Sequence, residues 1–246
     1  AELQFHCGVA SLHAAKFDDA VEYLERACAV KSNWHVARLA LAAAHESVGH
    51  PAEALAQLAT VNDAKPGQSP ILLAMGFCCE RLNDAPHAME MYRGAIEIDP
   101  TAIQARQRLA AAAVAQGEFT EAVEQYKYLR EFYPEAGWVL SSLGHLYYKM
   151  KDPGAAIDAF EMALAMDPEN WSLMDDEVEI LLEEGRYHEA IVRLKQLIEQ
   201  QPGFPDLLVR LGDVYANIGE DDQAMACYAG AVEMQPDYVE AVIKSG

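Results

Sequence analysis

The sequence predicts an all-α fold built from consecutive helix pairs, and three observations support this class. Prolines recur at a constant interval, at Pro66, Pro100, Pro134, Pro168, Pro202 and Pro236. When each proline is counted as position 32 of a 34-residue repeat, position 20 is alanine in all seven repeats. The alternation of apolar and polar residues that is typical of strands does not compete with the helical spacing. Few folds have this period, so we interpret the repeat first.

The repeats predicted by this register are residues 1–34, 35–68, 69–102, 103–136, 137–170, 171–204 and 205–238. Residues 239–246 would begin an eighth helix pair or form a cap. Position 8 is small in six of the seven repeats, as at Gly8, Gly76 and Gly144, and position 24 is always large and apolar or aromatic. Small residues at positions 8 and 20 let two helices approach closely, and the residue at position 24 fills the space beside them.

The repeat at residues 137–170 shows how each element is predicted. The first helix has an apolar face with i, i+3, i+4, i+7 spacing, formed by Leu140, Leu143, Gly144 and Tyr147. A break follows at residues 151–153, and a second apolar face extends from Ala156 to Leu164. The second helix ends before Pro168, because proline pushes the preceding residue out of helical conformation. The first-helix breaks of other repeats contain glycine, which favours helix C-termini, at Gly49, Gly117, Gly185 and Gly219.

This pattern resembles the tetratricopeptide repeat. The motif is Leu140-x2-Leu143-Gly144-x2-Tyr147, then Ala156-x3-Phe160, then Pro168, and the repeat at 205–238 has Leu208, Leu211, Gly212, Tyr215, Ala224, Tyr228 and Pro236. The resemblance covers residues 1–238 and implies a right-handed α-solenoid of antiparallel helix pairs, forming a single domain over residues 1–246. It also implies that the first helices line a concave groove that binds an extended peptide or a partner helix.

By this resemblance, positions 2, 5, 9, 12 and 13 of the first helices line the groove. The candidate binding residues are Phe5, Leu39, Leu73, Phe77, Trp138, His145, Tyr148, Asp175, Glu179, Asp206 and Asp213. They change from apolar in the first three repeats to mixed and aromatic in the fifth, and to acidic in the sixth and seventh. Two other interpretations stay open. The apolar residues would then contact neighbouring helices or a missing N-terminal segment, and the acidic ones would only keep the surface solvated.

Charge is concentrated towards the C-terminal repeats. The chain has 18 Lys+Arg and 39 Asp+Glu, a net charge of −21. Residues 171–238 have 15 acidic and four basic residues, which leaves −11 of that total. Acids at i and i+4, such as Asp175 with Glu179, each cost a few tenths of a kcal/mol. The pattern favours a basic segment as the partner, and disfavours nucleic acid and anionic membrane surfaces.

Glu177 interrupts an otherwise apolar position. It occupies position 7 of its repeat, where the other repeats have Cys7, Leu41, Met75, Leu109, Leu143 and Leu211. A carboxylate on a packing face needs a partner or an altered pKa. Slack in the register of that helix, a buried ion pair and a groove contact are the three explanations.

Cysteines and terminal sequences give a weak indication of location. The five cysteines are odd in number and irregular in spacing, which favours free thiols and a reducing compartment: Cys7, Cys28, Cys78, Cys79 and Cys227. No stretch approaches the 18 apolar residues of a transmembrane helix, so we expect no membrane insertion. The chain begins at Ala1 without a signal-peptide pattern, and reads as a piece of a longer protein. We therefore expect a cytoplasmic location.

Catalytic, metal and cofactor sites have little support in the sequence, and we expect none. His45-Glu46…His50 resembles a zinc-protease motif, but the second histidine comes one residue late. His145 could pair with Asp175 or Asp176, although no nucleophile motif accompanies them. By family resemblance, the absence of lysine at position 5 makes an acidic C-terminal tail a poor ligand.

The sequence therefore predicts a non-catalytic scaffold that binds a protein or peptide, with basic residues in the bound segment. The alternative is a structural or regulatory arm of a larger enzyme or complex. Self-assembly through exposed solenoid ends is a further possibility. Residues 239–243 are too short to cover Met225, Tyr228 and Val232, which we expect to be exposed.

Overall fold

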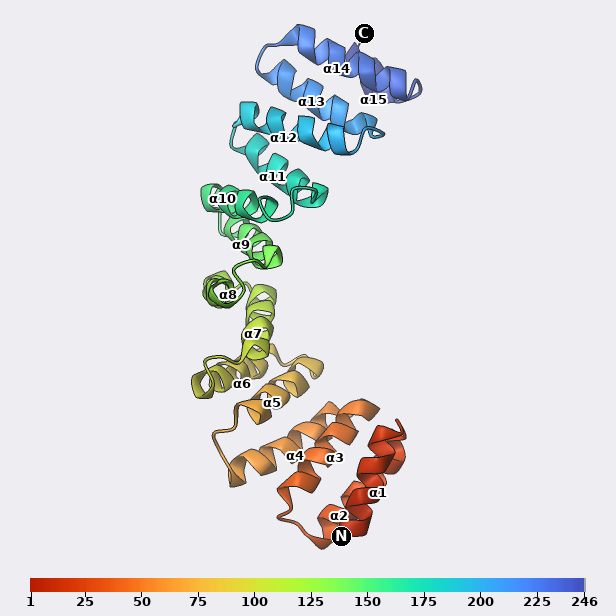
Figure 1. Cartoon of the computed structure of the whole chain (residues 1–246), viewed down its shortest axis with the longest axis vertical. Coiled ribbons are helices and arrows are strands. Elements are labelled where there is room, and N and C mark those ends of the chain that lie inside the picture. The colour runs from red at the N-terminus through yellow and green to blue at the C-terminus, as the bar shows by residue number, and fades with distance from the viewer. Residues whose placement is uncertain (246) are drawn as a thin grey trace. The chain divides into compact units, whose positions relative to one another are not determined.

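The computed structural model describes residues 1–245, which form fifteen α-helices and no strand (Figure 1). The helices are α1 (Glu2–His13), α2 (Phe17–Val30), α3 (His35–Val48), α4 (Pro51–Ala64), α5 (Ser69–Arg81), α6 (Ala85–Ile98), α7 (Ile103–Gln116), α8 (Phe119–Phe132), α9 (Gly137–Lys149), α10 (Pro153–Leu164), α11 (Trp171–Glu183), α12 (Tyr187–Gln200), α13 (Pro205–Asn217), α14 (Asp221–Met234) and α15 (Val239–Ser245). They form two compact units, an N-terminal unit of residues 1–129 and a C-terminal unit that begins at Arg130.

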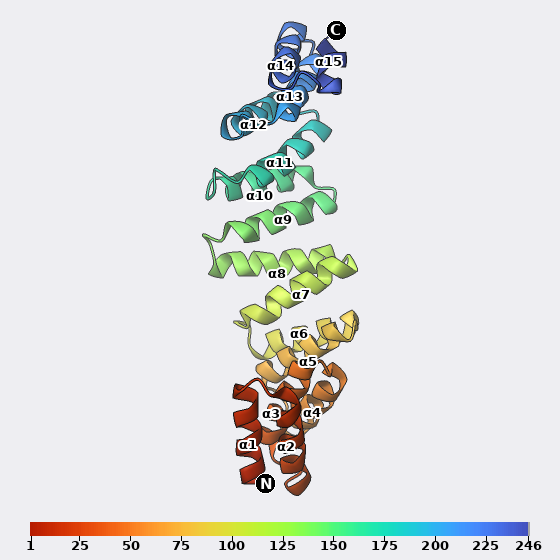
Figure 2. The ribbon, with the colours of Figure 1, turned by 90° about the vertical axis from the view of Figure 1, so that its right-hand side faces the viewer.

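Helix starts follow the predicted repeat register. The even-numbered helices begin at the same position of every repeat, from Phe17 to Asp221, and the odd-numbered helices do so from His35 to Val239. Neighbouring helices in the chain lie side by side from α1 to α7 in the N-terminal unit and from α9 to α15 in the C-terminal unit (Figure 2). The prediction of an all-α fold of helix pairs is therefore confirmed, whereas a single domain over residues 1–246 stays a prediction.

The turn inside each helix pair has one recurrent backbone conformation. Position 15 has positive φ in all seven repeats, at Ala15, Gly49, Asn83, Gly117, Lys151, Gly185 and Gly219. The N–H of position 16 donates a hydrogen bond to the carbonyl oxygen of position 11 at 2.8–2.9 Å each time, for example from Asp152 to Tyr147. This is the Schellman arrangement that ends a helix. The sequence predicted helix ends at the glycines. It did not predict the same positive-φ conformation at Ala15, Asn83 and Lys151.

Close contact between positions 8 and 24 joins the two helices of a pair. A Cβ atom added to Gly76 would lie 2.4 Å from the ring of Tyr92, and one added to Gly144 would lie 2.3 Å from Phe160. Alanine at position 20 is no more than 3% exposed in any repeat, for example at Ala156. The predicted role of these three positions is confirmed, because the repeats with glycine at position 8 leave no room there for a larger residue.

The last helix covers part of the C-terminal pair. Ala241 of α15 is fully buried in the same core as Tyr228, while Val239 and Ile243 remain exposed. The expectation that Tyr228 would be exposed is wrong, because its ring packs against Gly212 inside the α13–α14 pair. Met225 is exposed as expected, whereas Val232 is partly buried against the same core.

Glu177 lies on the packing face of α11, so slack in the helix register is not its explanation. Its side chain is 1% exposed, and Oε2 lies 2.8 Å from Nε of Arg193 on α12. Burial raises the pKa of Glu177, while the positive charge of Arg193 acts in the opposite direction. The buried ion pair is therefore the correct explanation among the three.

We expect Lys151→Gly to stabilise the protein. An L-residue in the left-handed conformation costs about 1–2 kcal/mol. Glycine avoids this cost but lowers stability by about 0.5–1 kcal/mol, because it loses more conformational entropy on folding. The net gain should be about 0.5–1 kcal/mol, measured as a higher urea midpoint. Gly185→Ala is the matched control, because a Cβ at Gly185 (φ 70°) would meet no atom within 4 Å. It should lower the midpoint, and a shift of the same sign in both variants would contradict the explanation.

We expect Arg193→Met to lower the free energy of unfolding by about 3 kcal/mol at pH 7, because it leaves Glu177 buried without its counter-charge. The double variant Glu177→Leu with Arg193→Met should be as stable as the wild type or more so, since leucine is usual at position 7.

The pH dependence gives a second measurement on the same variants. Without Arg193, the pKa of Glu177 should rise further. At a pH between this raised pKa and the lower pKa of the unfolded chain, Glu177 binds a proton in the folded single variant but not in the unfolded one. The loss in free energy of unfolding relative to the wild type should therefore become smaller as the pH falls from 7 towards the unfolded carboxyl pKa of about 4.3. Urea unfolding at pH 5 and pH 7 tests this, and equal stability of the single and double variants at pH 7 would refute it.

Candidate binding face of the first helices

The predicted binding residues of the N-terminal unit have two different environments. Phe5 is half-buried, and its ring centroid lies 4.7 Å from that of Trp34, so it packs against a neighbouring segment. Leu39, Leu73 and Phe77 instead line two open pockets on either side of α5. The interpretation as neighbour contact therefore holds for Phe5, and the other three residues stay candidates for binding.

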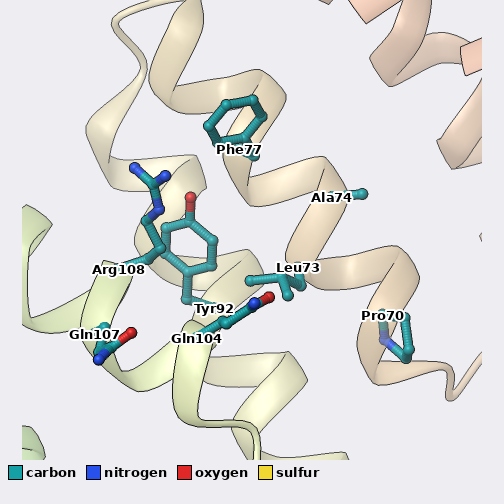
Figure 3. A pocket seen from close by; sticks show the side chains of 8 residues that line it. All are labelled: Pro70, Leu73, Ala74, Phe77, Tyr92, Gln104, Gln107 and Arg108. Carbon is teal, nitrogen blue, oxygen red and sulfur yellow. The ribbon is translucent and has the colours of Figure 1, made fainter. Parts of the chain in front are cut away.

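The first pocket lies between α5 and α7 and has a volume of about 480 Å³ (Figure 3). It is lined by Pro70, Leu73, Ala74, Phe77, Tyr92, Gln104, Gln107 and Arg108. The α5 wall is apolar and the α7 wall is polar, with Tyr92 of α6 between them. We call this the α5–α7 pocket.

The second pocket lies between α3 and α5, has a volume of about 420 Å³ and is largely apolar. It shares Pro70, Ala74 and Phe77 with the first pocket and adds Leu39, Ala42, Ala43, Glu46, Leu58, Gln68, Ile71 and Cys78. We call this the α3–α5 pocket. Glu46 forms an ion pair at 2.6 Å with Arg81. Burial, followed by the nearby Glu46 carboxylate, raises the pKa of Cys78 to about 12, so the thiol stays protonated.

Polar groups in the α5–α7 pocket have unused hydrogen-bonding capacity. Arg108 makes one contact of 3.2 Å to Glu80, and its guanidinium carbon lies 5.1 Å from the Phe77 ring centroid. Tyr92 is fully buried, and its hydroxyl oxygen has no hydrogen-bond partner of good geometry within residues 1–245. Burial raises the pKa of Tyr92 above its usual value, and the nearby Glu80 carboxylate adds to the rise through its charge and through hydrogen bonding to the hydroxyl. The hydroxyl therefore keeps its proton and is a donor.

Ion pairs between first helices engage two of the four predicted acidic residues in the C-terminal unit. Asp175 pairs with Arg210. Asp213 accepts hydrogen bonds from Nζ of Lys244, at 2.6 and 2.7 Å, and from the Tyr228 hydroxyl, at 2.8 Å. These two carboxylates are therefore largely satisfied within the chain.

The sequence contains a signal for these pairs. The basic partners Arg210 and Lys244, like Arg108 in the N-terminal unit, occupy position 6 of their repeats. Each pairs with an acid on the preceding first helix, with Asp175, Asp213 and Glu80 as the partners. Charges at position 6 therefore identify contacts between repeats, which reasoning from the acidic positions alone missed.

The aromatic end of the predicted face also contacts α11. The Tyr148 hydroxyl donates a hydrogen bond of 2.9 Å to Glu183, and this carboxylate raises the pKa of Tyr148. Nε2 of His145 lies 3.6 Å from Oδ2 of Asp176. Both groups of the His145–Asp176 pair are about half exposed, which is typical of a surface ion pair.

Five predicted residues of the C-terminal unit are exposed to solvent, two of which are His145 and Tyr148. Trp138 is 47% exposed. Glu179 and Asp206 are exposed and make no ion pair or hydrogen bond with any residue from 1 to 245. Of the four predicted acidic residues, these two therefore have carboxylates available to a ligand.

Features of catalytic or membrane sites are few. Among the described residues, no group of three or more His, Cys, Asp and Glu side chains could hold a metal ion. His45 is buried, and its ring centroid lies 6.2 Å from that of His50. Burial lowers the pKa of His45. None of the helices within residues 1–245 combines the length and apolarity needed to cross a bilayer.

Solved structures resemble the chain in fold. The C-terminal part of a tetratricopeptide repeat-containing protein from Cytophaga hutchinsonii has a TM-score of 0.72 and 18% identity, covering 98% of this chain and 99% of that one. YrrB, described as a tetratricopeptide repeat protein with an unusual peptide-binding site, has a TM-score of 0.57 and 20% identity, covering 76% of this chain and 96% of that one.

Sequence comparisons identify the repeats directly. Rattus norvegicus tetratricopeptide repeat protein 17 is 30% identical over 110 residues, which are 44% of this chain and 9% of that protein. Caulobacter vibrioides FlbA is 27% identical over 191 residues, which are 77% of this chain and 32% of that protein. The chain thus spans less than a third of the length of either relative. Family models described as tetratricopeptide repeat match residues 137–170 and 181–244. With the helix pairs described above, these matches identify the chain as a tetratricopeptide repeat protein.

Proposed function

We propose that this tetratricopeptide repeat scaffold binds an extended or helical segment of a partner protein on its first-helix face. The open pockets beside α5 carry this proposal. They are lined by Leu39, Leu73 and Phe77, which the sequence predicts as binding residues. An apolar side chain of the partner would be removed from water there, which is the usual driving force for such association.

We further propose that a segment bound to the C-terminal unit has basic residues. The exposed carboxylates of Glu179 and Asp206 support this, because both can accept hydrogen bonds from lysine or arginine. Trp138 adds an exposed aromatic ring to the same predicted face, and such a ring can bind a cation. Asp175 and Asp213 would contribute mainly through charge, because Arg210 and Lys244 already pair with them.

A non-catalytic role is typical of this repeat fold. YrrB, which resembles this chain in fold, is described as having a peptide-binding site. A role as an arm of a larger assembly remains the second candidate. The chain covers 9% of tetratricopeptide repeat protein 17 and 32% of FlbA, so these relatives contain long additional regions.

Charge reversal on the proposed basic-ligand surface should weaken binding. A library of random twelve-residue peptides, selected on the whole chain, provides the probes. For selected peptides that contain lysine or arginine, we expect Glu179→Lys with Asp206→Lys to lower affinity at least tenfold, measured by fluorescence anisotropy. The affinity of the wild-type chain should also fall as the salt concentration rises, because exposed charges are screened.

The matched control is Glu199→Lys with Glu233→Lys, which makes the same change in charge at exposed positions of the second helices α12 and α14. It should change affinity less than twofold. Equal losses in both double variants would indicate a general charge effect, and unchanged affinity in the first would refute the basic-ligand proposal.

A further inference from the structure

We infer that the α5–α7 pocket binds the carboxylate of an aspartate or glutamate side chain in the partner segment, next to an apolar residue that enters the α3–α5 pocket. The inference rests on the proposed binding of a partner segment to the first-helix face. It specifies the chemistry of that segment at the N-terminal unit, where an acidic side chain would meet the polar wall formed by α7.

The buried hydroxyl of Tyr92 is the first observation in favour. Buried polar groups in proteins nearly always have a hydrogen-bond partner, and this hydroxyl has only the nearby Glu80 carboxylate, with no contact of good hydrogen-bond geometry among the described residues. Figure 3 shows the hydroxyl directed to the same side of the pocket as the Arg108 guanidinium. A ligand oxygen placed between the two groups would satisfy the hydroxyl.

The unused donors of Arg108 are the second observation. A guanidinium has five N–H donors, and the contact of 3.2 Å to Glu80 uses one of them. Arg93 in the same unit shows that one arginine can hold two carboxylates, because it donates to Glu121 at 2.6 and 2.7 Å and to Glu118 at 3.2 Å. Arg108 can therefore hold a ligand carboxylate beside Glu80 and reduce the repulsion between the two acids.

Neutral donors on α7 complete the polar wall. The side-chain amides of Gln104 and Gln107 line the pocket and make no hydrogen bond with any residue in the described part of the chain. The N–H groups of both amides can donate to the same ligand group. A lysine or arginine of the partner is disfavoured here, because the positive charge of Arg108 would repel it.

Apolar residues specify the neighbouring side chain of the ligand. Pro70, Ala74 and Phe77 line both pockets, so a segment that fills one pocket continues directly into the other. The α3–α5 pocket adds Leu39, Leu58 and Ile71, which suit an aliphatic or aromatic side chain. Exclusion of water by these residues would also strengthen the hydrogen bonds between Arg108 and the ligand carboxylate.

The same selection of twelve-residue peptides tests this inference. We expect the enriched peptides that bind the N-terminal unit to share an apolar residue followed or preceded closely by aspartate or glutamate. Replacing that acid by its amide in the peptide should lower affinity about tenfold for the wild-type chain. With Arg108→Gln, the acidic peptide and its amide version should bind about equally. With Tyr92→Phe, the preference should shrink about threefold.

Arg26→Gln is the matched control, because Arg26 is an exposed residue of the second helix α2 whose ion pair is with Glu22 on the same helix. It should leave the preference for the acid intact. Circular dichroism and urea unfolding of each variant check that the fold is retained. A preference for the acid that survives Arg108→Gln would overturn the inference.

Leu73→Glu separates this inference from the proposed function. Peptides that lose binding with Leu73→Glu but show no preference for an acid would refute the carboxylate site and leave the binding face in place. Failure to enrich peptides, or peptides whose binding is unaffected by Leu73→Glu, would contradict the proposed function itself.

Discussion

The contact between a small residue at position 8 and a large side chain at position 24 determines how closely the two helices of each pair approach. At Gly144, where a Cβ would lie 2.3 Å from the Phe160 ring, even one added methyl group would force the helices apart. The left-handed residue at position 15 then reverses the chain at a fixed point. Both features recur with the period of the repeat, so equivalent side chains recur at equivalent places within each unit.

The first-helix face depends on this regular spacing in two ways. Successive first helices are close enough for a basic residue at position 6 to reach an acid on the preceding helix, as Arg210 reaches Asp175. Where the side chains are smaller or the charges are not fully used, pockets remain, as on both sides of α5. The same geometry thus satisfies some charges internally and leaves others for a partner.

Glu177 illustrates how a deviation from the repeat is accommodated. Every other repeat has an apolar residue or cysteine at position 7, and the carboxylate is retained there only with a counter-charge from Arg193 on the next helix. The cost of burying the pair makes the site a point of pH-dependent stability rather than a contact with ligand. Sequence reasoning identified the anomaly but could not choose among its explanations, because only the packing of α11 on α12 brings Arg193 to Glu177.

The sequence by itself determined the helix pairs, their register and their turns, because proline, glycine and the small residues act through local backbone geometry and short-range packing. It also located Leu39, Leu73 and Phe77 on the first-helix face. Tertiary structure decided which of the predicted acids are available, pairing Asp175 and Asp213 while leaving Glu179 and Asp206 exposed. It alone brought Tyr92 and Arg108 into one pocket, because side chains on different helices meet there only when α5, α6 and α7 pack together.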